Sequence, residues 1–145
     1  MGDTRCTACD LIAGTRPVPG GIVWRGGGFA LHALDGPSPL PGWLVLTAER
    51  HARALYDLDE ASTAALGPLA QRVMTLQRRL LGAEHAYLFA IGDALHHAHF
   101  HLVPRYAATP DRLRGRGAFE ARPEDARPAE ELAGAARLVG EAMGG

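Results

Sequence analysis

His97-Ala98-His99-Phe100-His101-Leu102-Val103-Pro104 is the stretch that decides the fold. Side chains alternate between the two faces of a β-strand, so the histidines at alternate positions would share one face. The apolar residues between them would share the other face, which suits packing against a core. Pro104 has no backbone donor and is expected to end this strand. The stretch therefore predicts a strand with one apolar face and one face lined by histidine.

The three in-phase histidines cannot all bind one metal ion. His97 and His101 would lie roughly 13 Å apart along a strand, whereas zinc holds nitrogen ligands at about 2.0–2.1 Å. Two neighbours can share an ion, and at least one histidine is then left for other chemistry. Imidazole, with an ordinary pKa of about 6.5, can act as a nucleophile, base or donor near neutral pH. The alternative is a half-buried strand whose histidines are solvated and have no chemical role. The regular alternation of three histidines disfavours it.

Composition restricts the class of protein. The chain has 145 residues, of which 47% are hydrophobic and 21% charged, as in one globular domain with a core. Its net charge of −1 gives no electrostatic reason to bind long nucleic acid or an anionic membrane. No apolar run approaches a membrane span, and residues 1–6 are polar without a signal-peptide core. We therefore expect a cytoplasmic protein whose two cysteines do not form a disulfide.

Cys6 and Cys9 form a Cys-x-x-Cys motif. A tetrahedral zinc site needs two further ligands, which would most simply be histidines. A redox role is disfavoured because the segment before Cys6 is too short for the preceding strand that such a motif requires. Zinc binding is the favoured interpretation, with incidental thiols as the alternative.

The hydrophobic pattern predicts an α+β fold: a sheet of about five mostly antiparallel strands, one long helix and a C-terminal helix. Strands are expected at 22–25, 29–34, 43–47, 86–91 and 97–104, with glycines 26–28 as a turn. Asp59 is expected to cap a helix that ends at Gly82. Its buried stripe would comprise Leu66, Leu69, Val73, Leu76 and Leu80.

The C-terminal part is expected to extend the same domain. Residues 1–106 would form its body, and residues 107–145 a loop followed by a helix. The Pro/Gly/Arg-rich segment 107–128 is expected to be a solvated, poorly ordered loop, with phosphate binding by its arginines as the alternative. The helix at 130–143 would dock through one apolar stripe, made of Leu132, Ala136, Val139 and Met143.

Two segments resemble the histidine triad (HIT) superfamily. Residues 97–103 match its alternation of three histidines with apolar residues in full. Residues 35–51 resemble the family's Asp-x-x-Pro-x-x-Pro-Gly-His-x-Leu-Val-x-Pro-x-x-His, and the departures from it include Trp43 in place of a histidine and Ala48 in place of a proline. The resemblance covers residues 6–105 and implies the HIT fold, usually found as a homodimer.

The resemblance implies roles for particular residues. His99 would attack the α-phosphorus of a nucleotide and form a nucleotidyl-histidine intermediate, with His97 and His101 completing the triad. Asp35 falls where the family's acidic residue binds the ribose hydroxyls, with a turn cap as the alternative. Trp43 would offer a stacking face to a base, unless it is a buried core residue.

Asp93 belongs to a short turn, residues 92–95, that departs from the family pattern. Many members carry a longer loop here whose asparagine, hydroxyl and amides hold the substrate's phosphates. Asp93 would repel a phosphate unless it is protonated or metal-bound. Backbone amides of the turn, Asp93 included, could still act as donors to the substrate.

The resemblance also implies a cofactor and an activity. In several bacterial HIT proteins a similar motif binds structural zinc, and the corresponding ligands here are Cys6, Cys9, His51 and His97. The expected function is a nucleotide hydrolase or nucleotidyl transferase of the dinucleoside polyphosphate or nucleoside phosphoramidate class. The alternatives are a nucleotide-binding or regulatory protein whose activity has lapsed or become specialised, and a zinc-dependent enzyme.

Overall fold

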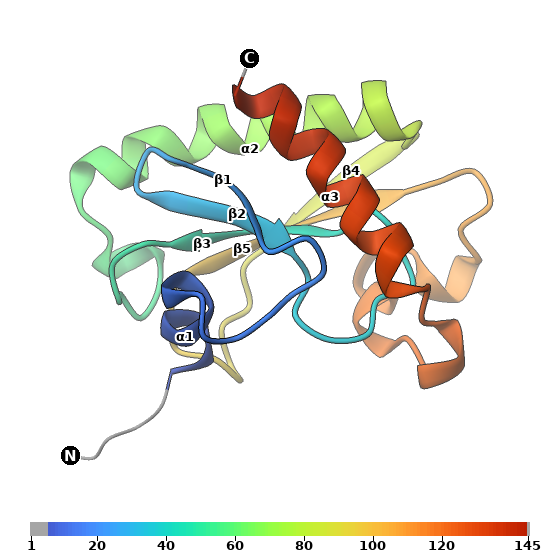
Figure 1. The fold of residues 1–145 in the computed structure, drawn as a ribbon, viewed down its shortest axis with the longest axis horizontal. Coiled ribbons are helices and arrows are strands. Elements are labelled where there is room, and N and C mark those ends of the chain that lie inside the picture. Colours follow the sequence, from blue (N-terminus) through green and yellow to red (C-terminus); the bar gives the residue numbers. More distant parts are fainter. Residues whose placement is uncertain (1–5, 145) are drawn as a thin grey trace.

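Five strands form one antiparallel sheet in the order β1-β2-β3-β5-β4 in this computed structural model, which describes residues 6–144. The strands are β1 (Ile22–Gly26), β2 (Phe29–Ala33), β3 (Leu44–Ala48), β4 (His85–Phe89) and β5 (His99–Arg105). The helices are α1 (Thr7–Ala13), α2 (Glu60–Leu81) and α3 (Ala129–Gly144). Figure 1 shows α2 and α3 on one side of the sheet and α1 on the other. The expectation about residues 1–5 lies outside the described part of the chain.

The tight β1–β2 connection depends on two glycines. Gly26 pairs with Phe29, so only Gly27 and Gly28 make the turn. Their φ angles are 63° and 91°, in the left-handed region that a two-residue hairpin requires and that side chains disfavour. The predicted turn is confirmed at Gly27 and Gly28, whereas Gly26 is the last residue of β1.

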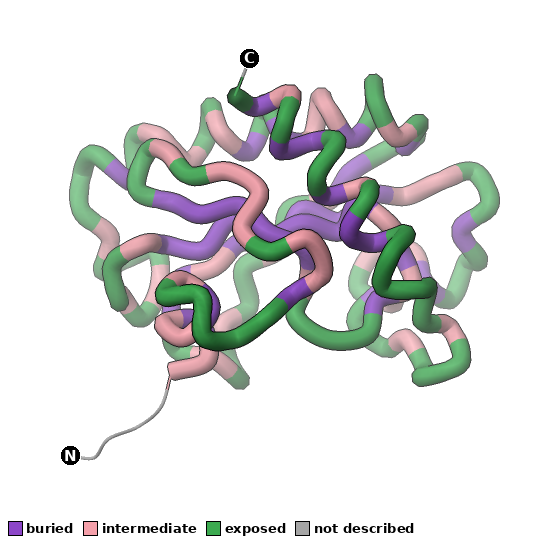
Figure 2. Tube along the Cα trace, viewed as in Figure 1, coloured by how far each residue is buried: buried purple, intermediate pink, exposed green. Residues whose placement is uncertain are grey.

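Alternation along the strands gives the sheet two distinct faces. The side of the sheet that α2 and α3 cover, here called the helix face, is apolar. Its fully buried strand residues are Phe29, Leu31, Leu44, Leu46 and Leu102, which pack with Val73 of α2 and Val139 of α3. The opposite side, called the histidine face, carries His32, Val45, Thr47, His99 and His101. Figure 2 shows β2 and β3, which are buried along their whole length, as continuous purple segments.

Helix α2 begins and ends where the sequence predicts. The Asp59 carboxylate accepts the Ser62 backbone N–H at 2.7 Å, and Gly82 ends the helix with a φ of 77°. The predicted stripe is wrong at Leu80, which is 41% exposed. The buried side of the helix instead includes Gln77, whose amide donates to the carbonyls of Gly42 and Leu102, both at 2.8 Å.

The C-terminal segment is more structured than predicted. Residues 107–128 contain three short 3-10 turns, at 111–113, 115–120 and 123–125. Leu113 and Ala118 are buried, and Arg112 forms an ion pair with Asp125, so this is not a solvated, poorly ordered loop. Helix α3 packs against α2, β1 and β2, and its predicted stripe of Leu132, Ala136, Val139 and Met143 is buried.

Strand β5 is shifted relative to the prediction. It begins at His99 rather than His97, and it continues through Pro104, which pairs with Ala86 of β4. Arg105 directs its carbonyl to Glu84 on the β4 side, so the imino nitrogen of Pro104 faces the other way. Pairing between β5 and β3 ends at Leu102, so β3 has no partner opposite Pro104. The missing N–H of Pro104 therefore costs no hydrogen bond between these two strands.

None of the described helices is long and apolar enough to cross a membrane.

Candidate functional site

A cavity of about 180 Å³ opens on the histidine face. The sheet supplies its floor through β2, β3 and β5, and helix α1 covers it through Thr7, Ala8 and Leu11. Three of its polar lining residues, Asp35, His99 and His101, were predicted as site residues. The structure therefore brings together residues that lie more than 60 positions apart in the chain.

His99 has a defined tautomer. Its Nδ1 lies 2.6 Å from the backbone carbonyl oxygen of His97. A carbonyl only accepts, so Nδ1 carries the proton and the neutral ring keeps its lone pair on Nε2. His99 is half-buried and also borders a second cavity of about 280 Å³, at the edge of β5 beyond the end of β4. The ring thus combines an available lone pair with open space beside it.

His101 has the opposite tautomer. The Trp43 indole N–H donates to His101 Nδ1 at 3.0 Å. An indole nitrogen only donates, so Nδ1 must hold the lone pair and the neutral ring carries its proton on Nε2. Burial, followed by the nearby charges of His99 and His32, lowers the pKa of His101 from 6.5 to about 4. His101 is therefore a neutral donor at neutral pH.

His32 is the cavity residue that sequence reasoning missed. The sequence places it on the surface or half-buried, but it is 3% exposed and lines the cavity. Its Nδ1–H donates to the Ala33 carbonyl at 2.7 Å, and the Thr47 hydroxyl lies 2.7 Å from Nε2. Burial lowers its pKa, which keeps the ring neutral. The unbroken apolar run around it is the signal that indicates a buried strand.

The remaining predicted substrate residues occupy different surroundings. Asp35 lies at the cavity rim, where its carboxylate pairs with Arg16 Nε at 2.6 Å. Trp43 is 3% exposed, so it belongs to the core beneath His101 rather than to an open stacking surface. Asp93 is exposed on the turn before β5 and is not among the residues that line either cavity.

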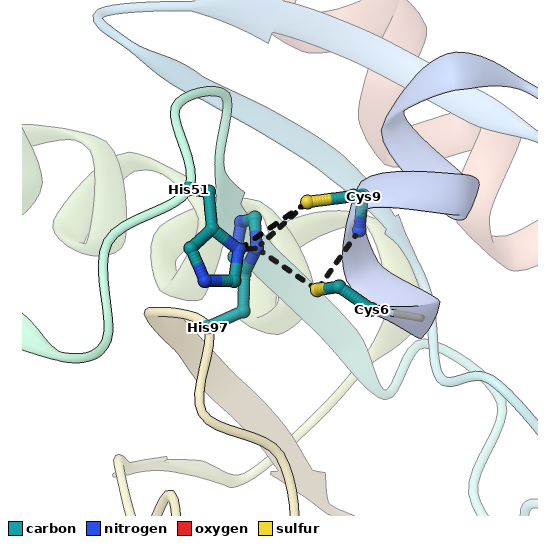
Figure 3. A group of neighbouring side chains, drawn as sticks. All are labelled: Cys6, Cys9, His51 and His97. Carbon is teal, nitrogen blue, oxygen red and sulfur yellow. Dashed lines mark hydrogen bonds between the residues drawn. The ribbon is translucent and has the colours of Figure 1, made fainter. Parts of the chain in front are cut away.

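Cys6, Cys9, His51 and His97 point toward one another, as Figure 3 shows. Their ligand atoms all lie within 4.8 Å of one another. Both cysteine sulfurs and His51 Nδ1 lie 3.2–3.6 Å from His97 Nδ1. Donor atoms of a tetrahedral zinc site lie roughly 3.3–3.8 Å apart, given Zn–N and Zn–S bonds of about 2.1 and 2.3 Å. Both the ligand set and the spacing fit a structural zinc ion.

The surroundings of the cluster also suit a cation. His97 Nε2–H donates to the Ala48 carbonyl at 2.7 Å, which leaves Nδ1 as the ligand atom and fixes the ring. Burial and the neighbouring Cys6 raise the pKa of the Cys9 thiol to about 11. A bound cation would reverse this effect by stabilising the thiolates. The His97 side chain belongs to this cluster, whereas its backbone carbonyl accepts from His99 Nδ1.

Comparison with known proteins identifies the fold. No protein-family model and no curated protein sequence matches the chain. The structure is similar to a Zn-bound histidine triad family protein from Mycobacterium smegmatis, with 20% identity, a TM-score of 0.73 and coverage of 99% of this chain and 98% of that chain. It is also similar to a HIT-like protein involved in cell-cycle regulation from Bartonella henselae, with 19% identity, a TM-score of 0.72 and coverage of 97% and 98%.

A hypothetical histidine triad nucleotide-binding protein from Sulfolobus tokodaii gives the same result. It is 19% identical, with a TM-score of 0.73 and coverage of 96% of this chain and 92% of that chain. The chain therefore has the HIT fold, an α+β architecture with a five-stranded antiparallel sheet, as predicted.

Proposed function

We propose that the protein is a HIT-type hydrolase or nucleotidyl transferase that acts at the α-phosphorus of a nucleotide through His99. The opposite tautomers of His99 and His101 carry this proposal. Their rings lie 5.1 Å apart, and one offers a lone pair while the other offers a proton. A phosphoryl group between them would meet a nucleophile and a hydrogen-bond donor together.

The covalent step would exchange one bond at phosphorus for another. His99 Nε2 forms a bond to the α-phosphorus, and the bond from phosphorus to the leaving group breaks with its electron pair. His101 Nε2–H donates to a non-bridging phosphoryl oxygen. Water or phosphate then forms a bond to the same phosphorus, and the bond from phosphorus to Nε2 breaks with its electron pair returning to His99. An attacking water passes its proton to the departed leaving group or to solvent, and the nucleotide is released. The nucleoside would occupy the 180 Å³ cavity near Asp35, and the leaving group the 280 Å³ cavity beyond His99.

We further propose that Cys6, Cys9, His51 and His97 bind a structural zinc ion. The fit of the four side chains supports this, as does the Zn-bound neighbour from Mycobacterium smegmatis. Cys6 is the N-cap of helix α1 and Cys9 lies in its first turn, and the helix also covers the cavity, so the metal would hold that cover in place. The HIT resemblance also implies a homodimer, which stays a prediction. Light scattering would test it by measuring the molar mass in solution.

Mass spectrometry of a trapped adduct tests the catalytic proposal. The protein is mixed with adenosine and guanosine polyphosphates and phosphoramidates, quenched, and digested. We expect a nucleotidyl group on His99, lost in His99→Ala and retained in His85→Ala, which removes an exposed histidine of β4. Nucleotide binding without an adduct or His99-dependent turnover would instead favour a binding protein.

Metal analysis tests the zinc proposal separately. We expect one zinc per chain in the wild type and none in Cys9→Ser, with a lower unfolding temperature and weaker nucleotide binding in the variant. A protein purified without zinc that does not take it up would contradict the proposal. Removal of zinc that abolished turnover while nucleotide affinity and fold stayed intact would favour a catalytic metal.

A further inference from the structure

We propose that Trp43 is a positioning residue that fixes His101 as a neutral Nε2–H donor, through the hydrogen bond from its indole nitrogen to His101 Nδ1. The inference deepens the proposed function and rests on it for its catalytic meaning. The tautomer itself is a property of the free protein. It can therefore be measured whether or not the protein turns over a nucleotide.

The hydrogen bond between Trp43 and His101 has only one possible direction. Trp43 Nε1 and His101 Nδ1 lie 3.0 Å apart. Because the indole nitrogen has a proton and no lone pair to offer, His101 must be the acceptor. If Nδ1 became protonated, two N–H groups would face each other and the hydrogen bond would be lost. Trp43 therefore opposes both the other neutral tautomer and the imidazolium.

Close packing restricts the movement of the indole. Trp43 is 3% exposed, and its backbone N–H donates to Leu40 while its carbonyl accepts from Leu34. Phe119, from the turn at 115–120, meets the Trp43 ring edge-on at 5.0 Å and the His101 ring at 5.1 Å. The C-terminal segment thus packs the donor and the acceptor against each other.

The other groups around His101 cannot replace this effect. The titratable side chains that face it are His99 on β5 and His32 on β2, and a positive charge on either one disfavours protonation of His101. Phe89 of β4 and Phe119 of the C-terminal segment bring only apolar rings to this cluster. Within the described chain, the hydrogen bond from Trp43 is what selects between the two neutral tautomers of His101.

Nitrogen-15 NMR of the histidine rings tests the proposal on the wild-type protein. We expect His101 to show a protonated Nε2 and an unprotonated Nδ1 at neutral pH, with no protonation above about pH 5. A coupling across the hydrogen bond should connect Nδ1 to the Trp43 indole nitrogen. A proton on Nδ1, or a His101 that titrates near its ordinary pKa of about 6.5, would overturn the proposal.

Substitution of the tryptophan provides the second test. In Trp43→Phe we expect the His101 pKa to rise by about 1 and both tautomers to become populated. The acid limb of kcat/KM should move to higher pH with it. Trp24→Phe, which alters a half-buried tryptophan of β1, is the matched control and should change neither. An unchanged His101 spectrum in a folded Trp43→Phe would contradict the proposal, and the wild-type spectrum decides if that variant does not fold.

Discussion

The helix face and the histidine face of the sheet belong to the same strands but are stabilised differently. On the helix face, apolar side chains of the sheet pack against α2 and α3 with no polar partner required. On the histidine face, three buried or half-buried imidazoles each depend on a directed hydrogen bond. Leu46 and Thr47 are neighbours in sequence, yet one serves stability and the other borders the site. Because successive residues of a strand lie on opposite faces, a substitution on one face can change stability while one on the other changes the site.

His99→Ala should give the largest effect and should confine it to the histidine face. Loss of a nucleophile removes the covalent path, so we expect turnover to fall by about 10³-fold or more. The free energy of unfolding should change by less than about 1 kcal/mol, because His99 is only half-buried. Steady-state kinetics and urea titration of the same preparation measure both quantities. A similar fractional loss of turnover and of the free energy of unfolding would show that the two faces are not independent.

Leu46→Ala should show the converse. Leu46 is fully buried on the helix face, so its truncation leaves a cavity and should lower the free energy of unfolding by about 3 kcal/mol. Turnover measured well below the unfolding temperature should stay within about twofold of wild type. Urea titration and kinetics test this pair. Turnover as low as that of His99→Ala would show that the two faces are coupled.

Acid should destabilise the histidine face. Burial lowers the pKa of His101 from 6.5 to about 4. Between pH 6.5 and pH 4, His101 is therefore protonated in the unfolded chain and neutral in the folded chain. Stability from this group is complete above about pH 6.5 and is lost as pH falls toward 4, by up to about 3 kcal/mol.

His101→Asn isolates that contribution, because its Oδ1 takes the place of Nδ1, can accept from Trp43 and does not titrate. Urea titrations from pH 7 to pH 4 should show a shallower loss in the variant. Proton binding by His32 and by the proposed metal ligands occurs in both proteins, so it cancels when the two pH curves are subtracted. Parallel pH curves for the two proteins would mean that His101 titrates normally in the folded state.

Asp59→Ala should give the smallest effect and should leave the histidine face unchanged. It removes the cap of α2, whose loss costs about 1 kcal/mol. Asp59→Asn, which keeps an acceptor for the Ser62 N–H, should recover most of that stability. Thermal unfolding of the two variants provides the measurement. A loss of nucleotide affinity in Asp59→Ala alone would show that α2 also positions the site.

The sequence predicts the helix face better than the histidine face. Hydrophobic periodicity and capping residues place α2, α3 and the five strands within a few residues. The sequence also groups the proposed metal ligands Cys6, Cys9, His51 and His97, but it does so through the HIT resemblance rather than through spacing. The three-dimensional cluster confirms that they meet.

What the sequence does not predict depends on contacts between distant segments. His32 is buried because β2 lies inside the sheet and Thr47 of β3 offers its Nε2 a partner. Gln77 is buried because two strand carbonyls lie where its amide can reach them. Phe119 reaches His101 only because the 107–128 segment folds back on the sheet. Such directed contacts have no periodic signal along the chain.

The packing of α3 has a consequence for the order in which the protein matures during synthesis. Gly140 lies so close to β1 that an added Cβ would be 2.5 Å from Val23 Cβ, and Ala136 and Val139 are fully buried. A nascent chain made only as far as residue 128 could form the hairpins of the sheet but would leave the β1 and β2 side of its helix face exposed. Ribosome-bound intermediates of this length should therefore be substrates for chaperones, and emergence of residues 129–144 should end that dependence.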